Sequence, residues 1–335
     1  MTPHDLRPKA APVHFGSRAP DLSVRNDEPM KDEHHDRNDK QDKESLFRRM
    51  RRGVFRSFLR AFPENRTGDR LVSLIRFVRF HKRLPNSSMS YNDVLHRLKT
   101  SDDILDPLRV FVSDKEFLKL YVRAVVGDAY VVPTLDVIKS KAAVDAYEFP
   151  AQCCIKATHT SGCVILRKQG EPVDRALIKS WFDINYYRTG REANYKLLKP
   201  KVIVDPILFG NWNLQDYKIF CLNGAPKLIQ VDVDRYIGHK RKYFDAAWNE
   251  QPFSIKYPRS DKVIPRPKNF EEMLSVAAQL SRDFGFVRVD LYSDGNNVCV
   301  GEITHCADNA DGKFMPASAE KLVSDHLFRD VKRPA

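Results

Sequence analysis

The sequence predicts an α+β fold with antiparallel sheets. Two observations carry this prediction. Short runs rich in β-branched and aromatic residues dominate from about residue 130 onward, and helical periodicity interrupts them only at about 174–187 and 270–283. Two pairs of these runs are joined by short turns, one at Asn223-Gly224 and one at Ser293–Asn297. Neighbouring strands joined by tight turns run antiparallel, and helices set among such strands indicate an α+β arrangement.

Composition limits the class of protein. The chain has 335 residues, 42% of them hydrophobic, which is enough for one large domain or two small ones. It has no apolar run long enough to span a bilayer and no apolar signal segment, so we expect a cytoplasmic protein. Its six cysteines form no Cys-x-x-Cys pair, which favours free thiols. The net charge of +12 predicts acidic partners: nucleotides, acidic polymers or an anionic membrane. Nucleic acid is an unlikely partner, because no nucleic-acid-binding signature accompanies the arginines.

The N-terminal part changes character along its length. Residues 1–45 are polar and charged, and predict a disordered tail. Residues 46–62 predict a basic amphipathic helix, which either lies on an anionic membrane surface or packs on the domain. Residues 65–110 predict a helical region, with helices at 71–83 and 91–99. The remaining residues, 111–330, form the predicted main domain.

That domain begins with a helix over 114–126 and continues with six predicted strands. A helix over 270–283 has Asn269 and Glu272 as a capping pair and Gly285 just beyond its end. The predicted strands are Cys153–Thr158, Val202–Val204, Tyr217–Leu222, Lys227–Val231, Val287–Tyr292 and Val298–Thr304.

The last two strands carry two acids. In a simple hairpin closed by Ser293–Asn297, Asp290 lies opposite Val300 and Arg288 lies opposite Glu302. Asp290 and Glu302 are then diagonal neighbours on one face, roughly 7–8 Å apart at the backbone. Carboxylates at that separation can bind one or two magnesium ions. The alternative is an ordinary salt-bridged hairpin face.

A lysine precedes a loop of small residues in the first of these strands. Lys156 is followed by Thr158, Ser161 and Gly162, and a loop of this kind presents N–H groups to phosphate oxygens. The alternative is a surface hairpin. Farther on, Asp216 and Lys218 share one face of a strand.

Several short strings, taken in order, resemble the ATP-grasp superfamily, and within it the teichuronopeptide-biosynthesis, TupA-like branch. The resemblance covers about residues 65–330. The strings that carry it are Ser113-Asp-Lys115, Ile155-Lys156 with its Thr-His-x-Ser-Gly loop, Asp216-Tyr-Lys218 through Asn223-Gly224, Val231 to Arg235, Tyr243-Phe-Asp245 ahead of Trp248, Val287 to Tyr292, and Gly301-Glu-Ile-Thr304.

The resemblance implies an ATP-grasp fold, in which two α+β subdomains enclose ATP, and it implies Mg²⁺. Implied phosphate contacts are Lys115, Lys156 and the loop residues Thr158, Ser161 and Gly162. Asp205, Pro206 and Leu208 would lie at adenine, and Asp216 at the ribose. Asp290, Glu302 and Thr304 would hold the metal, Arg288 would contact the transferred phosphoryl group, and Arg235, His239 and Arg241 would receive an anionic substrate.

The implied reaction is an ATP-dependent carboxylate–amine ligation through an acyl phosphate, joining an acidic sugar or polymer precursor to an amine such as an amino acid. Thr304, Asp205, Thr160 and Cys163 depart from residues common in the superfamily, which leaves a degenerate active site as an alternative. Two other functions stay open. Asp232-Val-Asp234 is the pattern with which glycosyltransferases hold a metal-bound nucleotide sugar, and residues 46–83 suit a non-catalytic protein that docks on a membrane or polyanion.

Overall fold

A computed structural model describes residues 53–55, 57–211, 214–234 and 238–329. The chain divides into two compact units, Met1–Arg56 and Ser57–Ala335, and the description below concerns the second. The predicted tail 1–45, most of the basic segment of the predicted helix 46–62, and Arg235 lie outside the described residues.

Helices open the second unit. They are α2 (Arg66–His81), α3 (Tyr91–Thr100), α4 (Pro107–Ser113) and α5 (Lys115–Val126), with a 3₁₀ turn at Asp102–Leu105. Three of these helices, α2, α4 and α5, have side-chain N-caps. Asn65, Asp106 and Asp114 each accept hydrogen bonds from backbone N–H groups of the first turn. These caps satisfy donors that a helix start leaves without partners. Predicted helices at 71–83, 91–99 and 114–126 therefore correspond to α2, α3 and α5, with α2 starting earlier.

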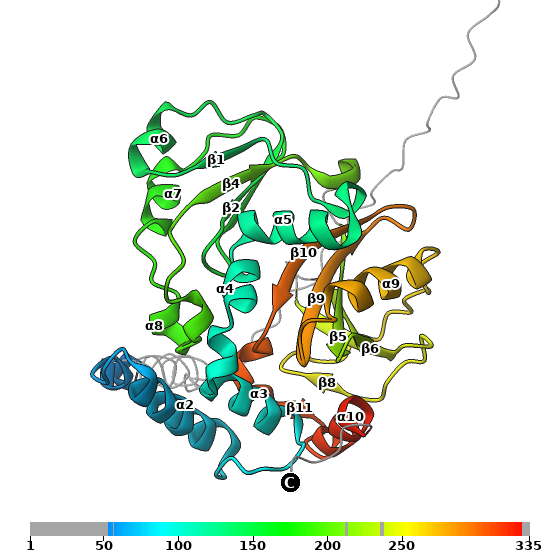
Figure 1. The fold of residues 1–335 in the computed structure, drawn as a ribbon. Coiled ribbons are helices and arrows are strands. Elements are labelled where there is room, and N and C mark those ends of the chain that lie inside the picture. Colours follow the sequence, from blue (N-terminus) through cyan, green and yellow to red (C-terminus); the bar gives the residue numbers. More distant parts are fainter. Residues whose placement is uncertain (1–52, 56, 212–213, 235–237, 330–335) are drawn as a thin grey trace, which may run out of the picture. The chain divides into compact units, whose positions relative to one another are not determined.

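A four-stranded antiparallel sheet follows, in the order β1-β4-β2-β3 (Figure 1). Its strands are β1 (Asp136–Ile138), β2 (Cys153–Ala157), β3 (Val164–Arg167) and β4 (Val202–Asp205). Helices α6 (Lys141–Ala146) and α7 (Arg175–Trp181) bury apolar side chains against it, including Val144, Ile178 and Trp181. The predicted helix over 174–187 is wrong in extent, because α7 ends at Trp181 and a separate short helix, α8 (Tyr187–Gly190), follows.

A five-stranded antiparallel sheet forms the rest of the unit, in the order β10-β9-β5-β6-β7. Its strands are β5 (Gln215–Leu222), β6 (Ala225–Val233), β7 (Lys240–Asp245), β9 (Phe286–Ser293) and β10 (Val298–Thr304). Asn223 and Gly224 have φ of 48° and 78°, as a two-residue hairpin turn requires. The α+β fold class, the Asn223-Gly224 hairpin and the pairing of the last two strands are confirmed, whereas the second turn is shorter than predicted because Ser293 belongs to β9 and pairs with Val298.

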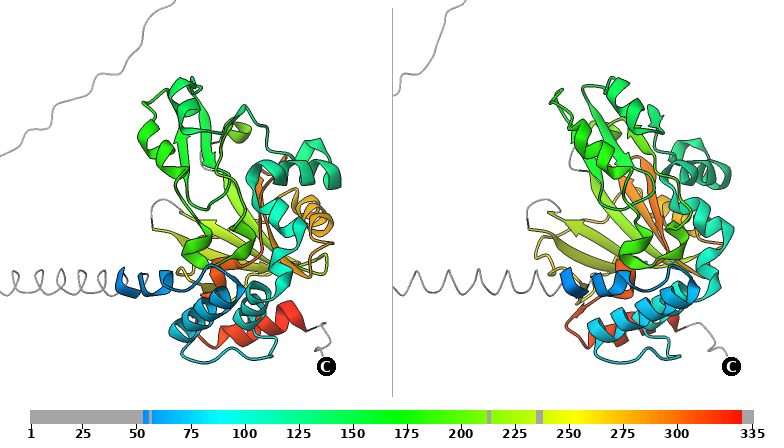
Figure 2. Two further views of the ribbon diagram at one scale, coloured as in Figure 1. Left: turned by 60° about the vertical axis from the view of Figure 1, so that its left-hand side comes forward. Right: turned by 90° about the vertical axis from the view of Figure 1, so that its left-hand side faces the viewer.

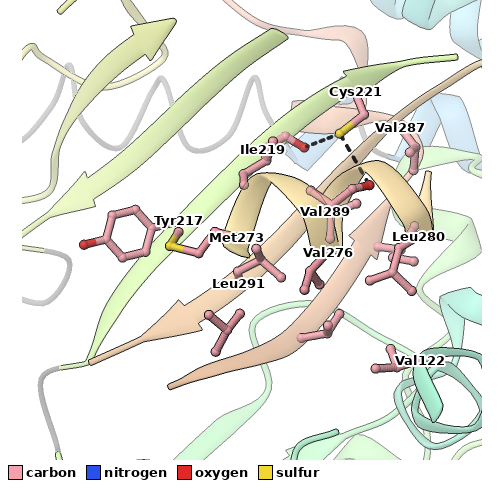
Figure 3. Packing of buried hydrophobic residues seen from close by; sticks show 14 of the residues in the cluster. Val122, Tyr217, Ile219, Cys221, Met273, Val276, Leu280, Val287, Val289 and Leu291 are labelled. Carbon is pink, nitrogen blue, oxygen red and sulfur yellow. Dashed lines mark hydrogen bonds between the residues drawn. The ribbon is translucent and has the colours of Figure 1, made fainter. Parts of the chain in front are cut away.

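Helix α9 (Phe270–Leu280) covers one face of this sheet (Figures 1 and 3). Met273, Val276 and Leu280 face Val289 and Leu291 in one apolar cluster, and all five side chains are buried. Burying such side chains is the main force that holds helix to sheet. The opposite face of the same strands carries the charged side chains, so the alternation of each strand separates core from site.

The capping pair predicted for α9 is wrong in its contacts. Asn269 makes no side-chain cap. Instead its Oδ1 accepts a hydrogen bond from Ser293 Oγ at 3.0 Å, and its Nδ2 donates to Asn297 O at 3.3 Å. Asn269 therefore links the start of the helix to the β9–β10 turn.

Short elements complete the unit: β8 (Ser254–Ile255) paired with β11 (Phe314–Met315), α10 (Ala319–Phe328), and 3₁₀ turns at Asp128–Tyr130, Ala193–Tyr195, Leu208–Gly210 and Ala307–Ala310. Tyr91 and Leu95 of α3 belong to one buried cluster with Phe286 and Leu327, so α3 shares a core with the five-stranded sheet. Figure 2 shows the helices of this N-terminal part, in blue and cyan, below the sheet. Within the described part of the chain, no helix has the length and apolar character to cross a membrane.

Candidate active site

The two predicted metal ligands lie directly opposite each other. The simple register that we predicted, with Asp290 opposite Val300, is wrong. Val300 pairs with Leu291, the register then shifts, and Glu302 pairs with Asp290. A β-bulge between Val300 and Glu302 causes the shift, since two residues on β10 there oppose one on β9. Because directly opposed residues share a face, both carboxylates lie on the charged side of the sheet.

The bulge residue is Gly301, and its lack of a side chain is required by space. A Cβ on Gly301 would lie 2.6 Å from Cε2 of Tyr292, a separation that no side chain tolerates. Without the bulge, Glu302 would follow Val298 and Val300 onto the apolar face by simple alternation. Gly301 thus allows the strand to keep its valines in the core and to turn Glu302 to the site.

Asp290 is held by two cations. Arg288 donates from Nε to Oδ1 at 2.6 Å and from Nη2 to Oδ2 at 2.8 Å, and Lys218 Nζ donates to Oδ2 at 2.9 Å. Burial alone would raise the pKa of Asp290, but these two cations bring it below its ordinary value. Asp290 is therefore ionised at neutral pH, as a metal ligand must be.

Glu302 and Thr304 differ from Asp290 in their contacts. Arg288 Nη2 donates to Thr304 Oγ1 at 3.1 Å. Within the part of the chain that the structure describes, the Glu302 carboxylate makes no hydrogen bond or ion pair, and it is partly exposed. The pair thus combines Asp290, whose carboxylate is held by two cations, with Glu302, whose carboxylate is open to a ligand.

Three lysines lie at the end of this face. A small pocket is lined by Lys115, Lys119, Lys156, Asp205, Leu118, Val132, Val300 and Gly301. Lys119 Nζ lies 2.6 Å from Asp205 Oδ1, and Lys156 Nζ lies 3.2 Å from Asp205 Oδ2. Because one carboxylate serves two ammonium groups and Lys115 adds a third, the pocket keeps a positive charge next to the bulge.

The loop after β2 docks on the start of α5. Lys115 Nζ donates to Thr160 O at 2.7 Å. Ser161 and Gly162 are exposed, and Gly162 has a φ of 85° with open space around it. Thr158 does not fit the predicted phosphate contact, since its side chain is fully buried and its hydroxyl donates to Asp114 Oδ2 at 3.3 Å.

The predicted nucleotide hinge follows β4. Pro206 and Leu208 are partly exposed, so backbone groups at this turn are accessible. The side chain of Asp205 is turned away from this role, because it is buried between Lys119 and Lys156. Asp216, predicted at the ribose, is ion-paired with Lys218 on the charged face of β5.

A buried ion network continues across β6 and β7. Arg241 Nε lies 3.0 Å from Asp232 Oδ1, and Arg241 Nη1 lies 3.2 Å from Asp308 Oδ2. His239 Nε2 lies 3.3 Å from Asp232 Oδ1, and Lys218 Nζ lies 3.9 Å from Asp232 Oδ2. Burial would raise the pKa of Asp232, but Lys218 and Arg241 lower it to about 2. Lys218 thus joins Asp216, Asp232 and Asp290 in one layer.

Comparison with known families decides the assignment. The sequence profile of the TupA-like ATP-grasp family matches residues 94–328. The chain belongs to this family. No curated protein matches it.

Solved structures with some likeness are ligases. A D-alanine–D-alanine ligase from Helicobacter pylori is 14% identical, with a TM-score of 0.39 over 68% of this chain and 61% of that one. The Bacillus anthracis D-alanine–D-alanine ligase is 13% identical, with a TM-score of 0.36 over 64% of each chain. A phosphoribosylamine–glycine ligase from Thermotoga maritima is 15% identical, with a TM-score of 0.35 over 58% of this chain and 48% of that one. The match spans less than two thirds of each solved chain, and family membership rests on the profile.

The TupA-like ATP-grasp chain contains site residues that the sequence reasoning left without a role. Lys119 is one helical turn after Lys115, a spacing that puts both on one face of α5. Gly301 belongs to the Gly301-Glu-Ile-Thr304 motif. Its bulge could have been inferred because Val298, Val300 and Ile303 cannot all face the core in a regular strand. Among the described residues, no group of three or more acidic, histidine or cysteine side chains forms a ready metal cage.

Proposed function

We propose that this protein is an ATP-dependent carboxylate–amine ligase in which Asp290 and Glu302 bind the magnesium of the nucleotide. The observation that carries the proposal is the bulge at Gly301, which sets Glu302 opposite Asp290 and borders the pocket of Lys115, Lys119 and Lys156. Acidic oxygens next to clustered ammonium groups suit a metal–triphosphate, because each binds one of its two components.

The donors fit magnesium. Asp290 and Glu302 supply carboxylate oxygens and Thr304 a hydroxyl, and hard oxygen ligands are those that Mg²⁺ prefers. Two protein carboxylates are sufficient, since Mg²⁺ in such sites completes its coordination with substrate phosphates and water. When bound, the cation supplies neutralisation of phosphate charge during phosphoryl transfer.

The protein's own residues position the rest. Lys115, Lys156 and the N–H groups around Ser161 and Gly162 bind phosphate oxygens, and the turn at Pro206–Leu208 holds the base. A substrate carboxylate oxygen attacks the γ-phosphorus of ATP, which forms an acyl phosphate and releases ADP. Arg288 balances charge on the transferred phosphoryl group when it exchanges part of its contact with Asp290 for the phosphate.

The second half of the reaction is displacement of phosphate from the acyl carbon by an amine. It needs no protein nucleophile, so positioning and charge neutralisation account for catalysis. We further propose that the acid is an acidic sugar or polymer precursor of the cell envelope, as in a teichuronopeptide-type polymer. His239 and Lys256 lie about the Tyr257 ring and are accessible, so such a substrate would contact them. Arg241, also expected to receive the substrate, is buried in its ion pairs with Asp232 and Asp308 and does not fit that role.

Of the two other functions, the described residues bear only on the glycosyltransferase. Asp232 is held in the network around Lys218, whereas Asp234 is paired with Lys262 at 2.7 Å on the surface. Asp232 is buried, whereas Asp234 is exposed and lies beyond the end of β6, which disfavours a metal shared by the two acids. A docking protein would depend mainly on arginines 48–52, which lie outside the described residues.

The test is ADP release by full-length protein with Mg-ATP, screened against uronic acids and amines together. Asp290→Asn and Glu302→Gln should reduce turnover at least about 100-fold, because each removes a metal ligand charge. Glu148→Gln, on an exposed loop, is the matched control and should keep wild-type turnover. Normal turnover in both site variants would refute the metal assignment.

A further inference from the structure

A second group of buried charges lies beside the Glu302 end of the site and has no role in the function proposed above. Lys99, near the end of α3, is 2% exposed, and Glu192, just before the turn Ala193–Tyr195, is 7% exposed. Lysine and glutamate are rarely buried this far unless they are paired. Their positions therefore call for a partner.

Neither charge has such a partner in the described residues. No hydrogen bond or ion pair there involves Lys99 Nζ or the Glu192 carboxylate, although the neighbouring Arg76 is ion-paired with Asp311. Their chain neighbours, Leu98 and Ala193, pack in one buried cluster, so the two charges lie near each other. Burial lowers the pKa of Lys99 to about 8, with Glu192 opposing the shift, and burial raises the pKa of Glu192 to about 7, with Lys99 opposing it. Two opposite buried charges that are near but not in contact fit a ligand that carries both complementary charges.

The surroundings of Glu192 favour a donor with several N–H groups. A Cβ on Gly190 would lie 3.2 Å from Glu192 Oε1 and 3.1 Å from Asn309 Oδ1, so both oxygens approach the same bare glycine. Asn309 Oδ1 is buried and has no hydrogen-bond partner, and the same holds for Asn194 Oδ1. Glu192 and Asn309 thus offer two neighbouring acceptors without a donor, which are costly to bury, and an ammonium group would satisfy both.

The backbone at Asn309 is also unusual. Asp308, Asn309 and Ala310 have φ of 50°, 58° and 60°, a left-handed run without glycine. Such residues cost on the order of 1–3 kcal/mol each and cluster at functional sites. Arg241 holds the run at Asp308 and His81 holds it at the carbonyl of Ala310, at 3.2 and 2.8 Å, so Asn309 is fixed beside Glu192.

The cluster is continuous with the proposed active site. After burial, the Glu302 charge is among the factors that raise the pKa values of Tyr186, Tyr195 and Glu192. The Tyr186 and Tyr195 rings pack edge to face with centroids 4.7 Å apart, and the Tyr186 hydroxyl reaches Ser161 of the phosphate loop.

We propose that Lys99 and Glu192 form the binding site for an α-amino acid, which is the amine substrate of the ligase. Its carboxylate binds at Lys99, and its ammonium group binds at Glu192 and Asn309. The proposal rests on the ligase function above, and it defines the nucleophile as a zwitterion rather than a simple amine.

Glu192 also accepts a proton in the second step. The ammonium group passes one proton to the Glu192 carboxylate, and the free amine attacks the acyl carbon. A C–N bond forms, and the bond between the acyl carbon and the phosphate oxygen breaks. The leaving phosphate takes the second proton and departs as hydrogen phosphate. The products are the amide, hydrogen phosphate and protonated Glu192, so atoms and charge balance.

Calorimetric titration of the full-length protein tests the site. The probes are the twenty proteinogenic amino acids with D-alanine and D-glutamate, each added in the presence of Mg-ADP. We expect at least one to bind, and we expect its amide and its N-acetyl derivative to bind at least tenfold more weakly, since each lacks one charge. Lys99→Met should weaken binding of the free amino acid at least tenfold and leave binding of the amide unchanged. Glu192→Gln should likewise weaken binding of the free amino acid at least tenfold, and it should leave binding of the N-acetyl derivative unchanged.

The same samples separate the failure of this inference from the failure of the ligase function. Lys321→Met, on an exposed lysine, is the matched control and should bind as the wild type does. Wild-type protein that binds no Mg-ATP would refute the ligase function. Normal Mg-ATP binding, with no amino acid bound or with wild-type amino-acid affinity in both variants, would overturn the assignment of Lys99 and Glu192.

Discussion

One residue without a side chain decides the geometry of the site. Gly301 makes the bulge that turns Glu302 toward Asp290. The sequence pointed to both acids, because they sit in two adjacent strands with a short turn. It predicted the wrong register, since strand propensity gives no sign of a bulge and the turn could be closed in more than one way. The face shared by the two acids was predicted correctly although the pairing was not.

Gly301→Ala should therefore damage the site and the fold together. The added methyl group meets the Tyr292 ring, so the strand must shift, and overpacking of this kind typically costs about 1–3 kcal/mol. Chemical denaturation measures this loss, and ADP release should fall at least about tenfold. The same substitution at Gly53, where a Cβ meets nothing, is the control. Wild-type stability and activity in Gly301→Ala would contradict the steric role.

Lys156 gives a second prediction at this scale. Lys156→Met should raise the Kd for ATP at least about tenfold, because it removes one of three ammonium groups from the pocket. The fold should survive, since Asp205 keeps its contact with Lys119. Calorimetry with ATP and Mg²⁺ measures the affinity, and Lys139→Met, an exposed lysine, serves as control. Equal affinity in the wild type and in Lys156→Met would exclude a phosphate contact.

The sequence predicted best the bounds of those elements whose side chains alternate regularly between the core and the site. Helix α9 and strands β2, β5, β9 and β10 match their expected positions within two or three residues. Strand β7 was missed, because Lys240-Arg-Lys-Tyr-Phe-Asp245 reads as a charged loop. Arg241 and Lys242 are nonetheless buried, since Asp232 and Glu250 pair with them. Charges that are neutralised by distant partners cannot be recognised from local pattern.

At the scale of elements, α9 should be the main support of the five-stranded sheet. Leu280→Ala should lower the free energy of unfolding by about 2–5 kcal/mol, because the side chain is fully buried against Val287 and Val289. Leu177→Ala, on an exposed face of α7, should change it by less than about 1 kcal/mol. Urea denaturation measures both. A small effect at Leu280 would mean that α9 is not part of the cooperative core.

The molecule as a whole brings together residues that are far apart in sequence. Lys99 and Glu302 lie about a hundred residues before and after Glu192, yet both shift its pKa. Leu98, Ala193 and Cys306, close to them in sequence, pack in one buried cluster. Composition and motif spacing cannot reveal that residues so far apart in sequence lie close together in the fold. The family's short strings could be recognised from sequence because each lies within one strand or loop.

Buried histidines should make the whole fold sensitive to acid. Burial and the adjacent Arg109 lower the pKa of His305 to about 3, so the folded chain keeps it neutral. The unfolded chain binds a proton there near pH 6.5, so unfolding becomes easier as pH falls from about 6.5 to about 3. His305→Gln should reduce the slope of unfolding free energy against pH by up to about 1.4 kcal/mol per pH unit. Equal slopes in the wild type and in His305→Gln would contradict this.

The central claim is that Asp290 and Glu302 together bind the divalent cation of a nucleotide. Manganese can stand in for magnesium, and its paramagnetic resonance reports free and bound ion directly. We expect the full-length protein to bind Mn²⁺ tightly in the presence of ADP, and Asp290→Asn and Glu302→Gln each to weaken that binding at least about tenfold. Unchanged Mn²⁺ affinity in both variants would contradict the account.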